Sequence, residues 1–423
     1  MNHRNARCPI RYTERRVVIT GLGIIAPNGN SKVEFWNSLL NGISGIGHIK
    51  SFDTSEYTTK IAGEVKNFDP LKYFDATEAR RMPRFTQFAI AAAKEAIADS
   101  GLIINHDNSH DTGIVIGVSI NALEIIEEQM KVLYEKGPTK ISPYTVTGAL
   151  PNAAAGFMSI ALGIKGRSAT ISTGCSSTLN ALGHAFELIK FGKVERILCG
   201  GADAPITPSI MGAFCASRSL SKRNEDPCGA SRPFDMNRDG YIISEGSAMF
   251  MMENLESALK RNAKIYAEIT GFGNTSEALS MYKMDDTGNE AARAMNMAIS
   301  DAGINSNEVD YISAHGSSSL VSDVRETRAI KMLFGGHSEK VKISSVKSMV
   351  GHPLGLSGGF QTAATILAGN SGYIPPTINY RNADPLCDLD YVPNESIRKK
   401  INTAVVNSFG LGGNNSSLVL KVY

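Results

Sequence analysis

Short apolar runs rich in β-branched residues alternate along the chain with longer stretches in which apolar residues recur every three or four positions. The short runs predict buried strands, and the longer stretches predict helices with one face in the core. Strands are expected at 16–25, 113–118, 168–172, 196–202, 266–272, 309–314, 341–346, 403–408 and 416–422, and helices at 85–100, 178–190 and 290–302. This alternation is typical of an α/β protein.

The second half of the chain contains predicted strands and helices of the same kinds as the first half. Two of the predicted helices are followed by a glycine, Gly101 and Gly303, which is a frequent helix C-cap. No low-complexity linker separates the halves. We therefore predict an internal duplication packed as one unit, with an N-terminal half over 16–262 and a C-terminal half over 263–423. A flexible tail is expected over 1–15.

The first predicted strand ends in the sequence Gly21-Leu22-Gly23. A dinucleotide-binding fingerprint requires G-x-G-x-x-G, and its third glycine position is occupied here by Ala26. We therefore predict a turn at these glycines and no nucleotide cofactor.

The composition narrows the class of protein. The 423 residues carry a net charge of +2, which gives no electrostatic case for binding nucleic acid or an anionic membrane. No apolar run approaches the roughly 20 residues that a membrane-spanning helix needs, and the polar N-terminus lacks the apolar core of a secretory signal. Six cysteines without a C-x-x-C pair favour free thiols in a reducing compartment. These features predict a cytoplasmic protein.

One cysteine and two histidines stand beside glycines at the ends of predicted strands. Cys175 follows Gly174 just before a predicted helix, where the positive helix end favours a thiolate. His315 and His352 each adjoin a glycine, and imidazoles can donate hydrogen bonds to a developing oxyanion. This set predicts an acyl-thioester site. A zinc site is the weaker alternative, because no local pair of ligands and no fourth ligand stand out.

Two further features concern the same site. Lys347 follows an apolar run and is expected to be buried, which requires a carboxylate or amide partner, and Asp323 or Glu326 could supply it. The glycine-rich stretch 409–415 is compatible with a simple hairpin, and equally with an oxyanion hole or a gate.

Ordered sequence blocks resemble the β-ketoacyl-acyl-carrier-protein synthases, condensing enzymes of thiolase fold, from about Arg16 to the C-terminus. The blocks are STGCSST, GHAFELI, GADAPITP, RNEDPCGASRPFD, AHGSSS with SDVRET, SSVKSMVGH, and PPTINY with DPLCDLDYVP. Within that family the chain is most similar to the ketosynthase α subunit of type II polyketide synthases. The resemblance implies a thiolase-like fold, in which two duplicated βαβ-type halves pack as five layers, α-β-α-β-α.

The resemblance also implies roles for individual residues. Cys175 would carry the acyl chain as a thioester, while His315 and His352 stabilise the enolate formed when malonyl-acyl-carrier-protein loses carbon dioxide. Lys347 would orient the site through a carboxylate network. The backbone N–H groups of Cys175 and Leu411, the latter flanked by Gly410 and Gly412, would form the oxyanion hole for acylation. Ser317 and Ser319 would bind the pantetheine arm, and Arg223 would contact the carrier protein. No metal and no cofactor is implied.

Two positions depart from the family pattern. Gln361 stands where the family usually carries a glutamate, which leaves the charge of Lys347 to be balanced by Asp323 or Glu326. Leu411 stands where most members carry a gating phenylalanine. Neither change removes a catalytic group.

The resemblance predicts decarboxylative condensation in polyketide synthesis, by a ketosynthase α that acts as a heterodimer with a chain-length-factor partner and receives its substrates from an acyl carrier protein. The first alternative is a homodimeric fatty-acid elongating 3-oxoacyl-acyl-carrier-protein synthase. A more remote alternative is an inactive carrier-binding scaffold subunit. In a cysteine hydrolase we would expect one histidine with an acidic partner, whereas this chain has two glycine-flanked histidines.

Overall fold

The computed structural model describes residues 14–423. Most of the predicted tail, 1–13, lies outside the described residues. Its last two residues are not free, however, because the backbone N–H of Arg15 donates to the carbonyl of Lys190 over 2.9 Å. The guanidinium of Arg15 also forms an ion pair with Glu195 at 2.6 Å. Arg15 is thus held against the body of the protein, and the flexibility of the tail stays a prediction.

Ten strands of the described chain form one hydrogen-bonded sheet, which consists of two five-stranded units with the same order. In each unit the first, second and third strands of the order are parallel, and the fourth and fifth are antiparallel to their neighbours. From its outer edge inward, the N-terminal unit consists of β5 (Ser168–Ile171), β4 (Thr112–Gly117), β6 (Arg196–Asp203), β7 (Gly246–Asn254) and β1 (Val17–Ile25). In the same direction, the C-terminal unit consists of β10 (Lys342–Ser344), β9 (Tyr311–Ser313), β13 (Thr403–Phe409), β14 (Asn414–Val422) and β8 (Ala267–Ser276). The two units join where Val17, Val18 and Ile19 of β1 pair with β8.

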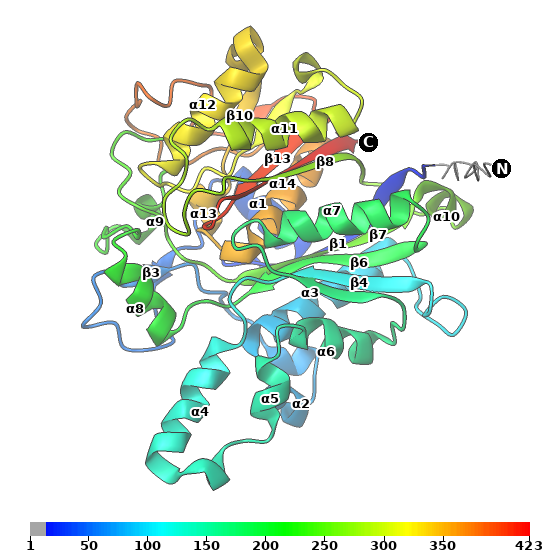
Figure 1. The fold of residues 1–423 in the computed structure, drawn as a ribbon, viewed down its shortest axis with the longest axis vertical. Helices are drawn as coiled ribbons and strands as arrows, with labels where there is room; N and C mark the ends of the chain where they lie inside the picture. The colour runs from blue at the N-terminus through cyan, green and yellow to red at the C-terminus, as the bar shows by residue number, and fades with distance from the viewer. Residues whose placement is uncertain (1–13) are drawn as a thin grey trace, which may run out of the picture.

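Helices cover both units and fill the space between them, which gives the five expected layers (Figure 1). α7 (Ser177–Lys190) and α14 (Ser357–Ser371) form the middle layer, and each contacts strands of both units. α3 (Arg84–Ser100) and α6 (Ala153–Leu162) cover the outside of the N-terminal unit, while α11 (Asn289–Asp301) and α12 (Ser322–Phe334) cover the outside of the C-terminal unit. The thiolase-like α/β fold is thus confirmed.

The same contact between a glycine pair and an alanine-rich helix occurs in both units. A Cβ atom at Gly21 or Gly23 of β1 would lie 2.1 or 1.9 Å from a backbone carbonyl oxygen of α3. At Gly271 and Gly273 of β8 it would lie 2.1 Å from a carbonyl oxygen of α11 in both cases. Only glycine allows so close an approach of a helix to a strand. The proposed boundary at 262/263 falls between the small helix α10 (Leu255–Lys260) and β8.

The structure corrects two details of the sequence prediction. Gly21 and Gly23 lie inside β1, which continues to Ile25 without a turn, because these glycines accommodate α3 rather than reverse the chain. The sequence analysis also missed β7, whose Ala-Met-Phe-Met-Met segment lacks β-branched residues. Pairing with β1 on one side and β6 on the other overrides that weak propensity.

A helical arm extends away from the layered body (Figure 1). It consists of α4 (Leu123–Lys136), none of whose residues is buried, and α5 (Tyr144–Ala149). The remaining elements are α1 (Lys32–Leu40), α2 (Ala76–Arg81), α8 (Pro208–Ala216), α9 (Pro227–Ala230), α13 (Lys347–Val350), and two small sheets of β2 (Gly47–His48) with β3 (Ile61–Ala62) and β11 (Tyr373–Ile374) with β12 (Ile397–Arg398). Within 14–423 no helix is both long enough and apolar enough to cross a bilayer.

Candidate active site

Cys175 lies at the corner between β5 and α7. Gly174 adopts a left-handed φ of 61° there, and the hydroxyl of Ser177 donates to the Gly174 carbonyl over 2.6 Å, which fixes the turn. The thiol is 7% exposed. Burial raises the pKa of Cys175 to about 11, although the backbone N–H of Leu411 and the charge of Lys347 both act to lower it. The expected position before a helix is present, but burial outweighs it, so the resting group is a thiol.

His315 follows β9 and is held by its backbone and by its ring. Its backbone N–H donates to Glu326 over 2.8 Å, and its Nδ1 accepts from the backbone N–H of Phe409 over 3.3 Å. Because Nδ1 is an acceptor, the neutral ring carries its proton on Nε2. Burial, together with the charge of Lys347, holds the pKa of His315 well below 6.5. The side chain is therefore a neutral hydrogen-bond donor at pH 7.

His352 precedes α14 and meets His315 edge to face, with 5.3 Å between the ring centroids. Its Nδ1 lies 3.0 Å from the hydroxyl of Ser357, and its backbone is paired with Ile242 and Ser244. Burial and the charge of Lys347 also hold the pKa of His352 well below 6.5. The two imidazoles thus form a neutral pair.

Lys347 is 1% exposed and does not contact a carboxylate directly. Its ammonium donates to the carbonyl of His315 over 2.6 Å and to Oε1 of Gln361 over 2.9 Å. Burial lowers the pKa of Lys347, and the charge of nearby Glu326 opposes that effect. The direct partners of the ammonium are therefore a backbone carbonyl and a neutral amide, and neither Asp323 nor Glu326 contacts it directly.

Gln361 is satisfied on every side. Its amide nitrogen donates to the carbonyls of Ser313, Ala314 and Asn407 over 3.1, 2.6 and 2.8 Å, while its oxygen accepts from Lys347. An amide fits this environment because its two N–H donors are shared among three carbonyls while its oxygen serves as an acceptor.

Asp323 and Glu326, both on α12, hold the loop that carries His315. Glu326 accepts from the backbone N–H groups of His315 and Gly316, each over 2.8 Å. Asp323 accepts from Ser317 over 3.0 Å and from Phe234 over 2.9 Å. Burial raises the pKa of both carboxyl groups. Their contacts position the loop rather than neutralise Lys347 directly.

The glycine-rich stretch is both a hairpin and a cover for the cysteine. It joins β13 to β14, and its Gly410 packs so close that an added Cβ would lie 3.1 Å from the backbone nitrogen of Cys175. Gly412 adopts a φ of 81°, and Leu411 between these glycines is 42% exposed. The stretch therefore brings the Leu411 N–H to the thiol.

One cavity of about 390 Å³ brings most of the predicted residues together. Cys175, His315, His352 and Leu411 line it, as do Ser317 and Ser319. Arg223 is not among the lining residues, and its guanidinium is engaged by the Asn237 carbonyl at 2.8 Å and by Asp239 at 3.6 Å.

Sequence reasoning missed several residues of this site. Tyr241 packs edge-on against the His352 ring at 5.3 Å, and the Ser408 hydroxyl donates to the Cys175 carbonyl over 2.8 Å. Asp203 accepts from the backbone N–H groups of Ser119, Ile120 and Gly355, which aligns three segments near the thiol. These residues come from distant parts of the chain, and no local pattern distinguishes them.

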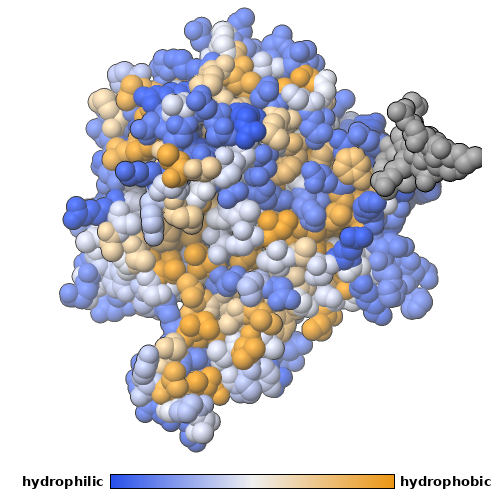
Figure 2. All heavy atoms as spheres, viewed as in Figure 1, coloured by the Kyte–Doolittle hydropathy of each residue, from blue (hydrophilic) through white to orange (hydrophobic). Residues whose placement is uncertain are grey.

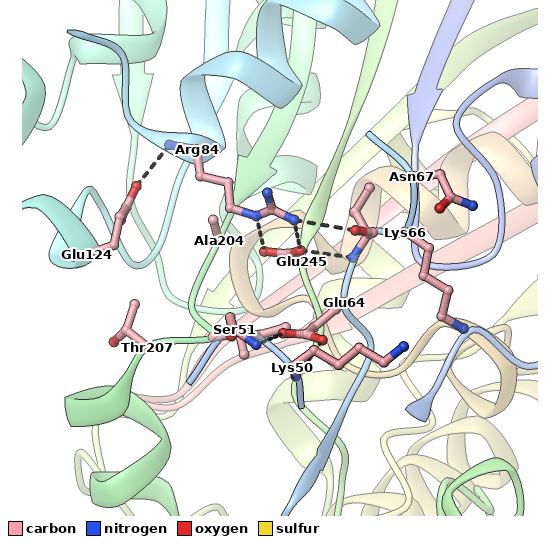
Figure 3. A pocket seen from close by; sticks show the side chains of 12 residues that line it. Lys50, Ser51, Glu64, Lys66, Asn67, Arg84, Glu124, Ala204, Thr207 and Glu245 are labelled. Atoms are coloured by element: carbon pink, nitrogen blue, oxygen red, sulfur yellow. Dashed lines mark hydrogen bonds and ion pairs between the residues drawn. The ribbon is translucent and has the colours of Figure 1, made fainter. Parts of the chain in front are cut away.

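A larger cavity, of about 520 Å³, lies elsewhere, between the starts of α3, α4 and α8 (Figure 3). Its three carboxylates are all engaged: Glu245 binds Arg84 over 2.6 Å, Glu124 accepts from the backbone N–H of Arg84, and Glu64 accepts from the backbone of Lys50 and Ser51. No cysteine or histidine lines it. The thiol and imidazole chemistry therefore belongs to the smaller cavity.

A thiol, two neutral imidazoles and backbone donors in one cavity, at the meeting point of two thiolase-like halves, define a condensing enzyme that acts as an acyltransferase. Family models for the N-terminal and C-terminal domains of beta-ketoacyl synthase match residues 14–258 and 266–381. The chain belongs to the beta-ketoacyl synthase family.

Proteins of similar sequence are named 3-oxoacyl-[acyl-carrier-protein] synthase 2. One from Synechocystis sp. is 44% identical over 97% of this chain and 99% of its own length, and one from Coxiella burnetii is 45% identical over 96% and 99%. A relative from Staphylococcus aureus is 42% identical over 97% and 99%.

Solved structures of similar fold include a ketosynthase in complex with its type II polyketide acyl-carrier protein and bound to the hexaketide (TM-score 0.89, 34% identity, 97% of this chain and 100% of that chain). The ishigamide ketosynthase/chain length factor has a TM-score of 0.91 and 32% identity over the same shares. A beta-ketoacyl synthase from Burkholderia phymatum has a TM-score of 0.90 and 32% identity, again over these shares.

Proposed function

We propose that this protein is a fatty-acid elongating 3-oxoacyl-acyl-carrier-protein synthase. Carbon–carbon bond formation is the chemistry for which the Cys175, His315 and His352 cavity is suited. The identity of 42–45% to 3-oxoacyl-acyl-carrier-protein synthases 2, over nearly the full length of both proteins, supports the fatty-acid pathway. The polyketide ketosynthase structures, at 32–34% identity, give the expected polyketide role less support.

The first half-reaction loads the enzyme. The sulfur of Cys175 attacks the thioester of an acyl chain on the phosphopantetheine arm of a carrier protein, so that a new sulfur–carbon bond forms and the bond to the arm breaks. The thiol proton leaves with the pantetheine sulfur. The backbone N–H of Leu411, which faces the thiol, and that of Cys175 stabilise the oxyanion.

The second half-reaction makes the carbon–carbon bond. Malonyl-carrier loses carbon dioxide, and the electron pair of the broken bond passes into an enolate whose oxygen accepts from His315 and His352. The enolate carbon then attacks the carbonyl carbon of the Cys175 thioester, the sulfur–carbon bond breaks, and the released thiolate takes up a proton from solvent to restore the thiol. Decarboxylation makes the carbanion without a strong base, so these steps require no metal and no redox cofactor.

We assign Ser317 and Ser319 to the pantetheine arm, because both line the same cavity as the thiol. Arg223 remains our candidate for contact with the acidic carrier protein, and its 37% exposed side chain would have to leave Asp239 in order to bind. We place the reaction in the cytoplasm, where free thiols persist.

We further propose that the protein acts as a homodimer. β5, which leads to Cys175, is the last strand of the sheet order and leaves its outer edge unpaired. α6 packs against β5, and its Ile160 is 81% exposed, while Met130 of the arm is 40% exposed. Figure 2 shows apolar residues gathered on the arm and on the adjoining face of the body. A second copy related by a twofold axis would cover both the edge and these residues.

The test is intact-protein mass after incubation with an acyl-loaded carrier protein, with no other subunit present. We expect the wild type to gain the mass of the acyl group and Cys175→Ala to gain none. Addition of malonyl-carrier should then release carbon dioxide and a chain two carbons longer. Loading only in the presence of a chain-length-factor paralogue would contradict the homodimeric fatty-acid assignment and favour the polyketide one.

A further inference from the structure

Arg325 of α12 is the largest side chain buried to 2% exposure or less in the described chain, and none of the reaction steps uses it. Its Nη2 lies 2.7 Å from Oε1 of Glu277, whose side chain is 1% exposed, and donates to Oδ1 of Asn415. The other guanidinium nitrogens, Nε and Nη1, are buried without a hydrogen-bond partner among the described residues.

The partners of Arg325 hold the glycine-rich stretch from outside. Glu277 follows β8, and its backbone N–H donates to the carbonyl of Gly413 over 3.0 Å. Asn415 is the second residue of the return strand β14, and its amide donates to the same carbonyl and to Glu277, each over 3.3 Å. The Glu277 carboxylate also accepts from the backbone of Asp285 over 2.9 Å, and the N–H of Gly412 donates to Met281. One guanidinium therefore connects α12 to both the 410–413 loop and the 277–285 segment.

Backbone hydrogen bonds close the loop, from Gly410 to Asn414 over 2.8 Å and from Gly413 to Gly410 over 3.1 Å, but its side chains do little to hold it in place. Gly412 and Gly413 have φ values of 81° and 80°, and glycine populates many backbone conformations equally well. Its single large side chain, Leu411, is exposed and cannot anchor it by packing. The hairpin pairing sets the path of the loop, and contacts from outside the loop add to what holds its tip in position.

The loop position matters to the chemistry at both of its ends. The backbone N–H of Leu411 faces Cys175, and the backbone N–H of Phe409 donates to Nδ1 of His315. The Phe409 ring itself lies under the guanidinium, with 5.3 Å between the guanidinium carbon and the ring centroid.

We propose that Arg325 is a positioning residue, which latches the 410–413 loop over Cys175 through Glu277 and Asn415. The role of the latch in acyl transfer rests on the proposed function, whereas its role in closing the loop does not. Burying a guanidinium with two unpartnered nitrogens costs desolvation free energy, which an apolar side chain of similar length would avoid. What the guanidinium adds is its contacts with Glu277 and Asn415, which fix the position of the loop.

The test compares the wild type with the double variant Arg325→Met, Glu277→Gln, which removes both charges and nearly conserves volume. Two rates are measured: alkylation of Cys175 by iodoacetamide, and acyl transfer from an acyl-loaded carrier protein. We expect alkylation to accelerate and acyl transfer to slow, each by at least about tenfold, because the thiol becomes accessible while the Leu411 donor is displaced.

Lys331→Met serves as the matched control, because it lies on the same helix and removes only an exposed ion pair with Asp388. Its two rates should equal those of the wild type. Arg325→Lys retains the charge but lacks the planar fork, so it should give intermediate rates, and it replaces the double variant if that protein fails to fold. Folding is checked by thermal unfolding.

The outcomes separate the latch from the proposed function. Alkylation within about twofold of the wild type, in a folded double variant or in Arg325→Lys, would overturn the latch, since opening the loop must expose the thiol. Faster alkylation supports the latch even if the wild type accepts no acyl group. Failure of the wild type to accept an acyl group would instead reject the condensing role.

Discussion

At the scale of single residues, the electrostatics of the site follow from burial around one cation. His315 and His352 are held neutral by desolvation and by Lys347, while Cys175 is held as a thiol. Neutral imidazoles are suited to donate hydrogen bonds to an enolate oxygen, because they bring no charge that would need to be neutralised beforehand.

This protonation state predicts an unusual pH profile. Because the pKa values of His315 and His352 lie well below 6.5, the rate of carbon dioxide release from malonyl-carrier should show no inflection near that pH as the solution is acidified. The unfolded chain, with ordinary histidines, binds more protons below 6.5, so the free energy of unfolding should fall as the pH falls through that value. Decarboxylation assays and urea unfolding across pH measure the two effects. A titration of activity at 6.5 would contradict the assignment.

A second residue-scale prediction concerns Gln361→Glu. The new carboxylate oxygen would face the three carbonyls that the amide nitrogen now satisfies, so we expect the free energy of unfolding to fall by about 1–3 kcal/mol at about pH 8. Burial and the three carbonyls act to raise the pKa of the introduced carboxyl group, against the opposing charge of Lys347, so we expect the stability it provides when protonated to be lost as pH rises. The loss should therefore shrink at about pH 5, as measured by urea unfolding.

Gln129→Glu is the control for that substitution, because the side chain of Gln129 uses only its oxygen, which accepts from Ser142. A carboxylate can replace that acceptor, so stability should change by less than about 0.5 kcal/mol. Equal effects of the two substitutions would show that the three carbonyls do not select the amide.

At the scale of elements, close contact between helix and strand determines how each half is built. The alanine-rich helices α3 and α11 approach β1 and β8 until their backbones nearly touch the glycines of the strands. The sequence shows both partners, but their separation in the chain, 69 residues from Gly23 to Ala92, conceals that they meet.

We therefore expect Gly23→Ala to reduce the free energy of unfolding by about 3 kcal/mol, because its Cβ would lie 1.9 Å from the Ala92 carbonyl oxygen and neither backbone can yield easily. Gly47→Ala, in β2, meets no atom within 4 Å and should change stability by less than about 0.5 kcal/mol. Chemical denaturation measures both. A tolerated Gly23→Ala would mean that α3 can move away from the sheet.

At the scale of the whole molecule, the duplicated halves place the reactive groups at one point. Cys175 follows β5 and precedes α7, while Lys347 and His352 lie between β10 and α14, the equivalent elements of the second half. Strand ends from both halves meet beside the two middle-layer helices. The site therefore requires both halves to be packed together.

The unpaired edge of β5 leads to a prediction about assembly. We expect the purified wild type to sediment as a dimer, and Ile160→Asp to weaken the dimer by at least about tenfold, because a carboxylate would be buried against the second copy. Met332→Asp, at an exposed position on α12 in the opposite outer layer, should leave the dimer intact. Analytical ultracentrifugation measures the association. A wild type that is monomeric alone and dimerises only with a paralogue would contradict the homodimer and favour the polyketide heterodimer.

The sequence by itself determined the fold class, most strands, and the identity of the thiol, histidines and lysine, because periodicity and the glycine-flanked motifs are local features. It could not determine what Lys347 contacts, that Gln361 serves three carbonyls, or that burial keeps Cys175 protonated. Nor could it identify β7, Arg325 or Asp203, whose roles depend on neighbours far away in the chain. Only the tertiary structure decides these points, because hydrogen-bond partners and desolvation are set by the packing of distant segments.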